Sequence, residues 1–158
     1  MPSDLETGAR AGGSATFRRF LADELLPAVR ADYRASAETA IIGESAAGLF
    51  IVETLLREPV LFDAYVAVSP SVWWNAGGLV KDAPGLLADD ARVGKRVFLT
   101  VGDEPESTAL VATLAELLAP RVTLTYAPMP EETHGTIFHG AALRGLRAVL
   151  PPVAPAVP

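Results

Sequence analysis

The hydrophobic and polar positions follow two different periods along the chain, and the alternation of these periods predicts strands and helices in turn. Short apolar runs occur at residues 37–43, 64–69, 96–102 and 121–129. Each run is bounded by polar residues, glycine or proline, which fits a short buried strand better than a helix. We therefore expect four strands, spread over most of the chain.

Between these runs, apolar residues recur at three- and four-residue steps, which is the spacing of one face of a helix. The first such stripe begins at Ser14, which is placed to cap the helix, and Pro27 is expected to bend or shorten it. The apolar members of this stripe are Phe17, Phe20, Leu21, Leu25 and Val29. Further helices are predicted over residues 46–57, 85–91, 107–117 and 139–150. Residues 69–78, rich in Ser, Pro, Asn and Gly, are predicted to form a loop.

This order of elements predicts an α/β fold, a three-layer sandwich around a mainly parallel sheet of about four strands joined by right-handed crossovers. Residues 1–13 are expected to form a flexible leader, residues 14–150 the α/β domain, and residues 151–158 a proline-rich tail. In such sheets ligands bind outside the carboxyl ends of the strands. The candidate chemistry is therefore expected at the strand ends.

Composition narrows the function further. The formal charge of −6 gives no surplus of Lys and Arg for holding a phosphate backbone, so nucleic acid is not expected as a partner. No apolar run reaches the roughly 18 residues of a membrane helix, and the polar N-terminus lacks the apolar segment of a signal peptide. A membrane association is therefore not expected, and a cytoplasmic location is the default. With no cysteine and with no Asp and Glu set at ligand spacing, neither a thiol site nor a metal site is predicted.

The first predicted strand ends in the sequence "GESAAG", where Ser45 stands between a strand and a helix. A sharp strand-to-helix turn flanked by small residues lifts a serine hydroxyl into the open, which is the geometry of the nucleophile elbow Gly-x-Ser-x-Gly. Here Ala47 occupies the fifth position and the glycine is delayed to Gly48. The alternative is an ordinary strand-to-helix turn, with Gly48 present for close packing.

Two later strand ends carry the other groups that an activated serine needs. Three carboxylates, Asp103, Glu104 and Glu106, follow the third strand, and His134 lies in the loop after the fourth. A serine followed by an acid and then a histidine is the chain order of the α/β-hydrolases. Alternatively, the carboxylates cap the next helix and His134 is a solvated loop residue. His139 is the weaker candidate for the base because it falls at the start of a predicted helix.

The chain resembles an esterase family of the α/β-hydrolase superfamily that is related to siderophore (enterochelin) esterases and esterase D. Four segments, spread over most of residues 13–150, carry the resemblance: "FLADELLPAVRADYR", "GESAAGLFIVETLLREPVLFDAYVAVSPSVWWN", "FLTVGDE" and "HGTIFHGAALRGL". The second segment is the most specific. The resemblance implies a serine ester hydrolase that acts on a small-molecule ester and needs no cofactor.

The resemblance also implies residue roles. Ser45 would be the nucleophile and His134 the general base, with the backbone N–H of Ala46 as an oxyanion donor. The acid would follow "FLTVG", where Glu106 is favoured and Asp103 and Glu104 are rivals. The candidates for substrate contact are Glu44, Trp73 and Trp74, although the two tryptophans could equally pack against the helix layer.

Members of this family begin with further strands, which supply a second oxyanion donor and cover the strand at residues 37–43. This resemblance therefore implies an impaired hydrolase with an open apolar sheet edge. Such an edge predicts either a homodimer formed through it or an aggregation-prone monomer of low stability. The alternative function is a non-catalytic α/β-hydrolase remnant or an association module.

Overall fold

The computed structural model describes residues 12–150, so most of the expected leader and the whole of the expected proline-rich tail lie outside the described residues. The described chain divides into two compact units, residues 12–37 and residues 38–150. Each unit is described by itself.

The first unit is helical throughout most of its length. It consists of α2 (Ser14–Phe20), a π-helical turn η1 (Leu21–Leu25) and α3 (Leu26–Asp32). Gly13 is the N-cap of α2 and no side chain caps it, so the predicted capping role of Ser14 is wrong. Pro27 lies in the first turn of α3, directly after the wider η1 turn. Because proline lacks the N–H that an α-helix needs at this point, a change of helical geometry there is expected.

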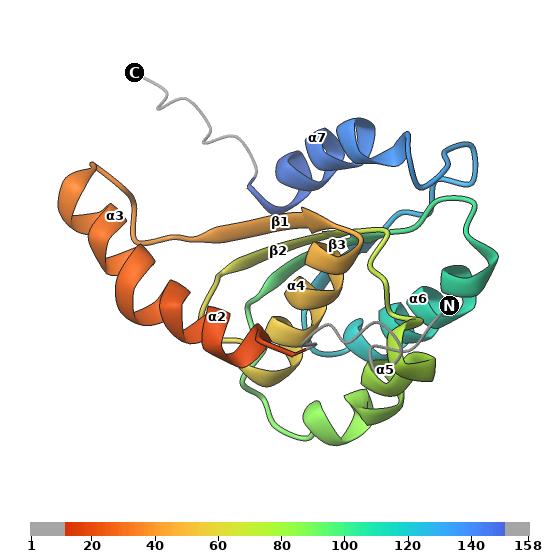
Figure 1. The fold of residues 1–158 in the computed structure, drawn as a ribbon, viewed down its shortest axis with the longest axis horizontal. Helices are drawn as coiled ribbons and strands as arrows, with labels where there is room; N and C mark the ends of the chain where they lie inside the picture. Colours follow the sequence, from red (N-terminus) through yellow and green to blue (C-terminus); the bar gives the residue numbers. More distant parts are fainter. Residues whose placement is uncertain (1–11, 151–158) are drawn as a thin grey trace. The chain divides into compact units, whose positions relative to one another are not determined.

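The second unit is built on a four-stranded sheet, and all neighbouring strands are parallel (Figure 1). The strands are β1 (Ala40–Glu44), β2 (Ala64–Val68), β3 (Arg96–Thr100) and β4 (Thr123–Tyr126), in the order β1-β2-β3-β4. Glu44 pairs with Val68, and Val68 with Thr100, so the first three strands end level with one another. The predicted parallel α/β sheet is confirmed.

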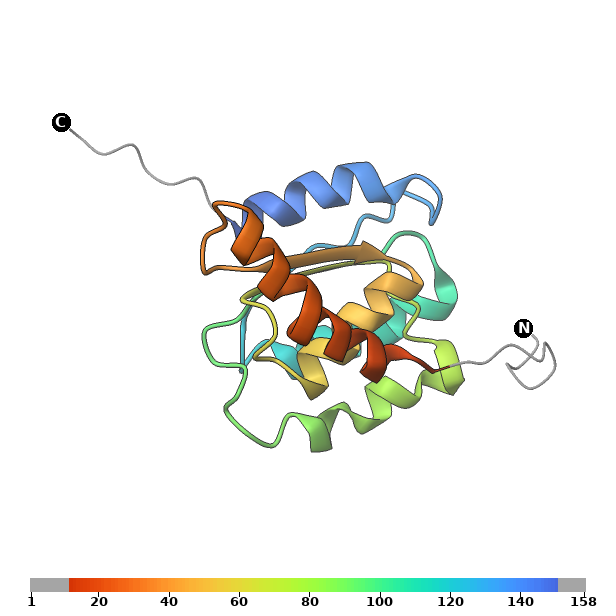
Figure 2. The ribbon, with the colours of Figure 1, turned by 60° about the vertical axis from the view of Figure 1, so that its left-hand side comes forward.

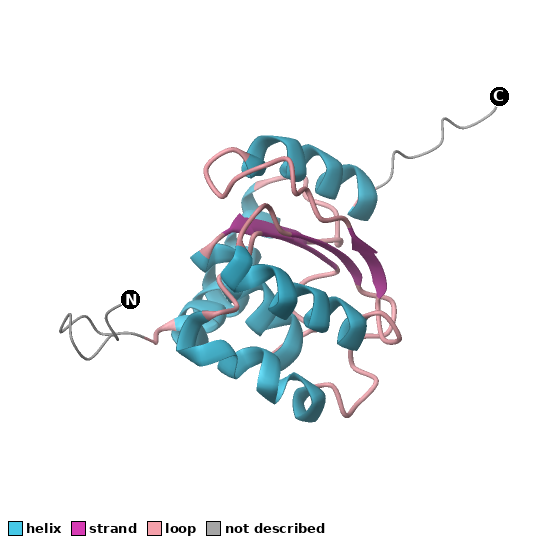
Figure 3. Cartoon of the chain, turned by 90° about the vertical axis from the view of Figure 1, so that its right-hand side faces the viewer, coloured by secondary structure: helices cyan, strands magenta, loops and turns pink. Residues whose placement is uncertain are grey.

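Helices cover both faces of this sheet, as Figures 1 and 2 show. The helices are α4 (Ala46–Arg57), α5 (Trp74–Leu86), α6 (Pro105–Leu118) and α7 (Ile137–Val149). In the side view of Figure 3 the strands lie between α7 on one face and the remaining helices of this unit on the other. All of β2 is buried, and Val66 and Phe98 lie in one apolar cluster with Ala141 of α7. This arrangement is the three-layer sandwich that the sequence predicts.

The segment after β2 differs from the prediction. Residues 69–78 were expected to be a loop and residues 85–91 a short helix, whereas α5 begins at Trp74 and ends at Leu86. Three consecutive residues, Asn75, Ala76 and Gly77, have left-handed backbone angles inside it. Glycine and asparagine tolerate this conformation, which is why their presence suggested a loop. No helix within residues 12–150 is long and apolar enough to cross a membrane.

Candidate active site

Ser45 occupies a strained turn between β1 and α4. Its backbone angles are φ 58° and ψ −121°, and few non-glycine residues adopt a positive φ. The turn is held by a hydrogen bond of 3.1 Å from the Ser45 N–H to the carbonyl of Val68, at the end of the neighbouring strand. Strain of this kind persists only where the surrounding structure enforces it, and it is concentrated at functional sites. The geometry agrees with the nucleophile elbow expected from "GESAAG".

The small residues around Ser45 are required by close contacts. A Cβ on Gly48 would lie 3.0 Å from both the Cα of Pro70 and the carbonyl oxygen of Val68. A Cβ on Gly43 would lie 2.8 Å from the Cβ of Ala47. Gly43 therefore leaves the space that the methyl group of Ala47 occupies. This contact explains how alanine is accommodated at the fifth position of the elbow, where the usual pattern has glycine.

Ala46 is the first residue of α4, and Ser45 is the N-cap. The first N–H groups of a helix have no intrahelical acceptor. No hydrogen bond within residues 12–150 engages the N–H of Ala46. This N–H is therefore available to an anionic oxygen, as the expected oxyanion donor must be, and the positive end of the helix dipole favours the same charge.

An imidazole–carboxylate pair lies at the ends of β3 and β4. The Nδ1 of His134 is 3.0 Å from Oε2 of Glu104, and Glu104 is buried while His134 is half exposed. A carboxylate only accepts hydrogen bonds, so the hydrogen resides on Nδ1 and the Nε2 of His134 is left as the basic nitrogen. This is the relation between the acid and the base of a catalytic triad.

The structure distinguishes the three carboxylates that the sequence left open. Glu106, which the sequence favours as the acid, lies exposed in the first turn of α6, and Asp103 is also exposed. Glu104, one of the rivals, is the carboxylate placed against His134. Pro105 gives a sequence signal for this difference, because proline favours the first position of a helix and so places Glu104 before it and Glu106 within it.

The loops that carry Glu104 and His134 are fastened to each other by their backbones. The N–H of Asp103 donates to the carbonyl of Glu132 at 2.8 Å, and a Cβ on Gly102 would lie only 2.6 Å from that same carbonyl oxygen. On the histidine side, the N–H of Thr133 donates to Oγ1 of Thr136 at 3.0 Å. The absence of a side chain at Gly102 is therefore what lets the two loops approach.

Ser45 has a partner that the sequence did not indicate. Its Oγ is 3.3 Å from Oγ of Ser71, which follows β2, and no hydrogen bond within residues 12–150 joins it to His134. Ser69 links the same segment to the third strand end, because its Oγ accepts a hydrogen bond from the N–H of Gly102 at 3.3 Å. The ends of β1, β2 and β3 are thus connected around the serine. A serine three residues after the end of β2 was the available signal for Ser71.

The expected substrate-contacting residues lie near these strand ends in the chain. The rings of Trp73 and Trp74 are 5.9 Å apart between centroids; Trp73 is half-buried and Trp74 is exposed. Glu44, the last residue of β1, has a buried Oε1 with no hydrogen-bond partner among the described residues. His139 is exposed on the first turn of α7, with its ring against Phe138. Residues 12–150 contain no group of three or more acidic or histidine side chains arranged to hold a metal ion.

Comparison with known proteins identifies the family. Residues 4–131 match a family model described as "Putative esterase". The ferri-bacillibactin esterase BesA of Bacillus subtilis is 26% identical over 156 residues, covering 91% of this chain and 54% of BesA. The siderophore enterobactin esterase of Emericella nidulans is 39% identical over 83 residues, covering 51% of this chain and 27% of that protein.

A solved structure gives the same result for the fold. The BES protein of Bacillus cereus matches with a TM-score of 0.78 at 25% identity, over 89% of this chain and 56% of that one. The chain thus spans about half the length of BesA, a curated relative that matches 91% of it. From the extent of the family match, together with the α/β fold, we conclude that this chain belongs to the esterase family of α/β-hydrolase type.

Proposed function

We propose that the chain carries the catalytic machinery of a serine ester hydrolase, with Ser45 as nucleophile, His134 as general base and Glu104 as the acid. The observation that carries this proposal is the Glu104–His134 hydrogen bond, which lies at the same edge of the sheet as the strained elbow of Ser45. Glu104 replaces Glu106, the carboxylate that the sequence favours, because Glu104 is buried and in contact with the imidazole.

In the proposed mechanism, Oγ of Ser45 attacks the ester carbonyl while Nε2 of His134 takes its proton. Glu104 fixes the tautomer of His134 and stabilises the imidazolium that forms. The N–H of Ala46 stabilises the oxyanion of the tetrahedral intermediate. His134 then returns the proton to the departing alcohol, and water hydrolyses the acyl enzyme by the same steps. In the part of the chain that the structure describes, Oγ of Ser45 is paired with Ser71 and not with His134. This pairing is compatible with the mechanism, because the hydrogen bond between a nucleophile and its base often forms only in the substrate complex.

We propose a small-molecule ester of the siderophore class as the substrate. Support comes from the relatives, whose names describe esterases of siderophores. Trp73, Trp74 and Glu44 are the candidates for contact with it, since aromatic side chains combine a large apolar surface with rigid geometry.

The proposal is tested with a fluorophosphonate probe, which reacts with an activated serine and requires no knowledge of the natural ester. Purified protein is labelled, digested and mapped by mass spectrometry, with Ser45→Ala as the variant and Ser107→Ala as the matched control. Label on Ser45 that is lost in Ser45→Ala and kept in Ser107→Ala is the expected result. A folded protein that takes up no label would rule out an activated serine.

One observation favours the second candidate, a chain that serves association. β1 is an edge strand of the described sheet, and Ile42 on it is 36% exposed. Unpaired N–H and C=O groups on such an edge are a template for pairing with another strand. A homodimer formed through β1 is the partner proposed for this role. Analytical ultracentrifugation tests it: a dimer that Ile42→Lys converts to monomer supports the association, whereas a wild-type monomer at micromolar concentration contradicts it.

A further inference from the structure

The segment Ser69–Pro70–Ser71, here called the Ser-Pro-Ser bridge, links the two strand ends on either side of β2. On one side Oγ of Ser69 accepts from the N–H of Gly102 at 3.3 Å. On the other side the N–H of Ser71 donates to the carbonyl of Ser45 at 3.1 Å. Ser69 has a φ of 39°, so its backbone is held in an unfavourable conformation at the start of the bridge. The position of Ser71 relative to the elbow is therefore fixed by the backbone.

The bridge also packs directly on the elbow. A Cβ on Gly48, in the first turn of α4, would lie 3.0 Å from the Cα of Pro70. The carbonyl of Ser71 in turn accepts from the N–H of Trp74 at 3.0 Å. The backbone of Ser71 is thus held on both sides, which keeps this residue beside the elbow.

The difference in burial between the two hydroxyls bears on which of them donates the hydrogen bond. Ser71 is only 7% exposed, and within residues 12–150 its Oγ has Oγ of Ser45 as its one hydrogen-bond partner. A hydroxyl carries one hydrogen, and leaving that hydrogen unpaired in a buried position is costly. Ser45 is less buried than Ser71 and can direct its own hydrogen elsewhere. The arrangement therefore favours Ser71 as donor and Ser45 as acceptor.

We propose that Ser71 is a positioning residue for the nucleophile, a role that rests on the proposed function. Its hydroxyl donates to Oγ of Ser45, which leaves the hydrogen of Ser45 free to point toward His134. When that proton passes to Nε2 of His134, Ser71 keeps its own hydrogen and stabilises the negative charge that develops on the attacking oxygen. A donor to an oxygen that becomes charged contributes more than a donor to a neutral one.

The opposite arrangement makes the opposite prediction. If Ser45 donated to Ser71, its hydrogen would point away from the base, and Ser71 would hold the nucleophile in an unreactive state. Removing the Ser71 hydroxyl would then speed the reaction. The sign of the effect of Ser71→Ala therefore decides between the two arrangements.

The experiment measures the second-order labelling of Ser45 by a fluorophosphonate probe, resolved into the probe's binding constant and its maximal rate. We expect Ser71→Ala to lower the maximal rate about tenfold, the loss of one hydrogen bond, with the binding constant unchanged. Ser71→Thr, which keeps a hydroxyl, is expected to restore most of the rate. Ser107→Ala removes a buried hydroxyl that has no hydrogen-bond partner among residues 12–150, and this variant is expected to label like the wild type.

The outcomes separate this inference from the function on which it rests. A wild type labelled at Ser45 together with a Ser71→Ala variant that is equally fast or faster overturns the role of Ser71 alone. Equal slowing in Ser71→Ala and Ser71→Thr points to packing and also overturns it. If the wild type takes up no label, both the role of Ser71 and the proposed function are wrong. Should Ser71→Ala not fold, Ser71→Cys retains the shape with a weaker donor, and an undiminished rate in that variant contradicts the proposal.

Discussion

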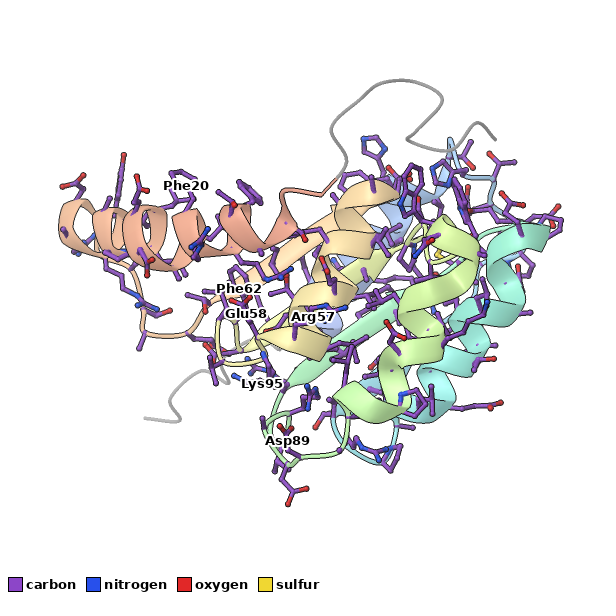
Figure 4. The ribbon with its side chains drawn as sticks, turned by 60° about the horizontal axis from the view of Figure 1, so that its bottom comes forward. Phe20, Arg57, Glu58, Phe62, Asp89 and Lys95 are labelled. Carbon is purple, nitrogen blue, oxygen red and sulfur yellow. The ribbon has the colours of Figure 1, made fainter. Side chains whose placement is uncertain are left out.

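The two ends of the sheet in residues 38–150 differ in how fully their polar side chains are hydrogen-bonded. At the amino end, Arg92 is buried, and its guanidinium donates to the carbonyl of Leu55 at 3.1 Å and to that of Leu56, the last turn of α4. Asp63 accepts from both the N–H and the hydroxyl of Thr39. Figure 4 labels several side chains of this end, among them Arg57, Asp89 and Lys95. These polar side chains pair with backbone and side-chain groups of the folded chain itself.

At the carboxyl end, by contrast, strain and unused hydrogen-bonding capacity accumulate. Ser45 and Ser69 both have positive φ there. The buried side-chain atoms without a partner in residues 12–150 include two carboxylate oxygens at this end, Glu44 Oε1 and Glu104 Oε1. Functional sites keep polar groups unpaired for a ligand or a reaction at a cost in stability. On the proposed function, the amino end stabilises the fold and the carboxyl end carries the chemistry.

The largest effect is expected at His134. Replacing it with alanine removes the proposed base, and hydrolysis of a short-chain ester such as p-nitrophenyl acetate should fall by roughly 10⁴-fold or more. His139→Ala is the matched control, because His139 is exposed on α7 and is expected to leave the rate unchanged. Equal rates for His134→Ala and the wild type would rule out His134 as the base.

Arg92 should show the reverse pattern, with a loss of stability and no loss of chemistry in the folded fraction. Arg92→Ala leaves the carbonyls of Leu55 and Leu56 buried without their donor, so we expect the free energy of unfolding to fall by about 2–4 kcal/mol. Arg57→Ala is the control, since Arg57 is 41% exposed and its ion pair with Glu53 contributes about 0–1 kcal/mol. Urea unfolding measures both. A loss at Arg57 equal to that at Arg92 would contradict this difference.

Gly102 lies where the loop that carries Glu104 packs against the loop that carries His134. In Gly102→Ala the new methyl group would meet the carbonyl oxygen of Glu132, so the loop that carries His134 must shift. We expect a loss of about 1–3 kcal/mol in stability, accompanied by slower fluorophosphonate labelling. Gly85→Ala has open space around the new Cβ and lies in α5, so the same change should stabilise the protein by roughly 0.5–1 kcal/mol. A Gly102→Ala variant with wild-type stability would refute the close contact.

The smallest effect is a pH dependence at Asp63. The hydrogen bond from the N–H of Thr39 is the largest cause that holds the pKa of Asp63 below its ordinary value of 3.8, with Lys95 adding to it and partial burial opposing it. A carboxyl group with a lowered folded pKa stabilises the protein above its unfolded pKa, and this contribution is lost as the pH falls through the folded pKa. The thermal midpoint of wild type should therefore fall more than that of Asp63→Asn when the pH is lowered below about 4. Parallel curves for the two proteins would contradict the prediction.

Much of the fold could be predicted from the sequence because the four strands are short apolar runs and most helices carry a clear apolar stripe. The start of α5 could not, since its first turn contains the left-handed residues Asn75 and Ala76 and its interior contains Pro84, all of which are typical of loops. The capping role expected for Ser14 was wrong because Gly13 precedes the first helical residue.

The candidate site was predicted in part. Ser45 and His134 follow from local sequence, because each is the reactive side chain in a short loop after a strand. The spacing of the three carboxylates did not predict which one contacts His134. Glu104 and Glu106 are only two residues apart, and the start of α6 between them makes the first position buried and the second exposed. The contact between Ser71 and Ser45 depends on the approach of Pro70 to Gly48, which is a property of the folded chain.

The most direct test of the division between the two ends compares Glu104→Gln with Glu106→Gln in the rate of fluorophosphonate labelling at Ser45. The two substitutions are chemically identical and lie two residues apart, but only Glu104 contacts His134. We predict that Glu104→Gln slows labelling by roughly 10²- to 10⁴-fold, as loss of the acid in a triad does, and that Glu106→Gln labels like the wild type. Labelling slowed by Glu106→Gln and unaffected by Glu104→Gln would contradict the account.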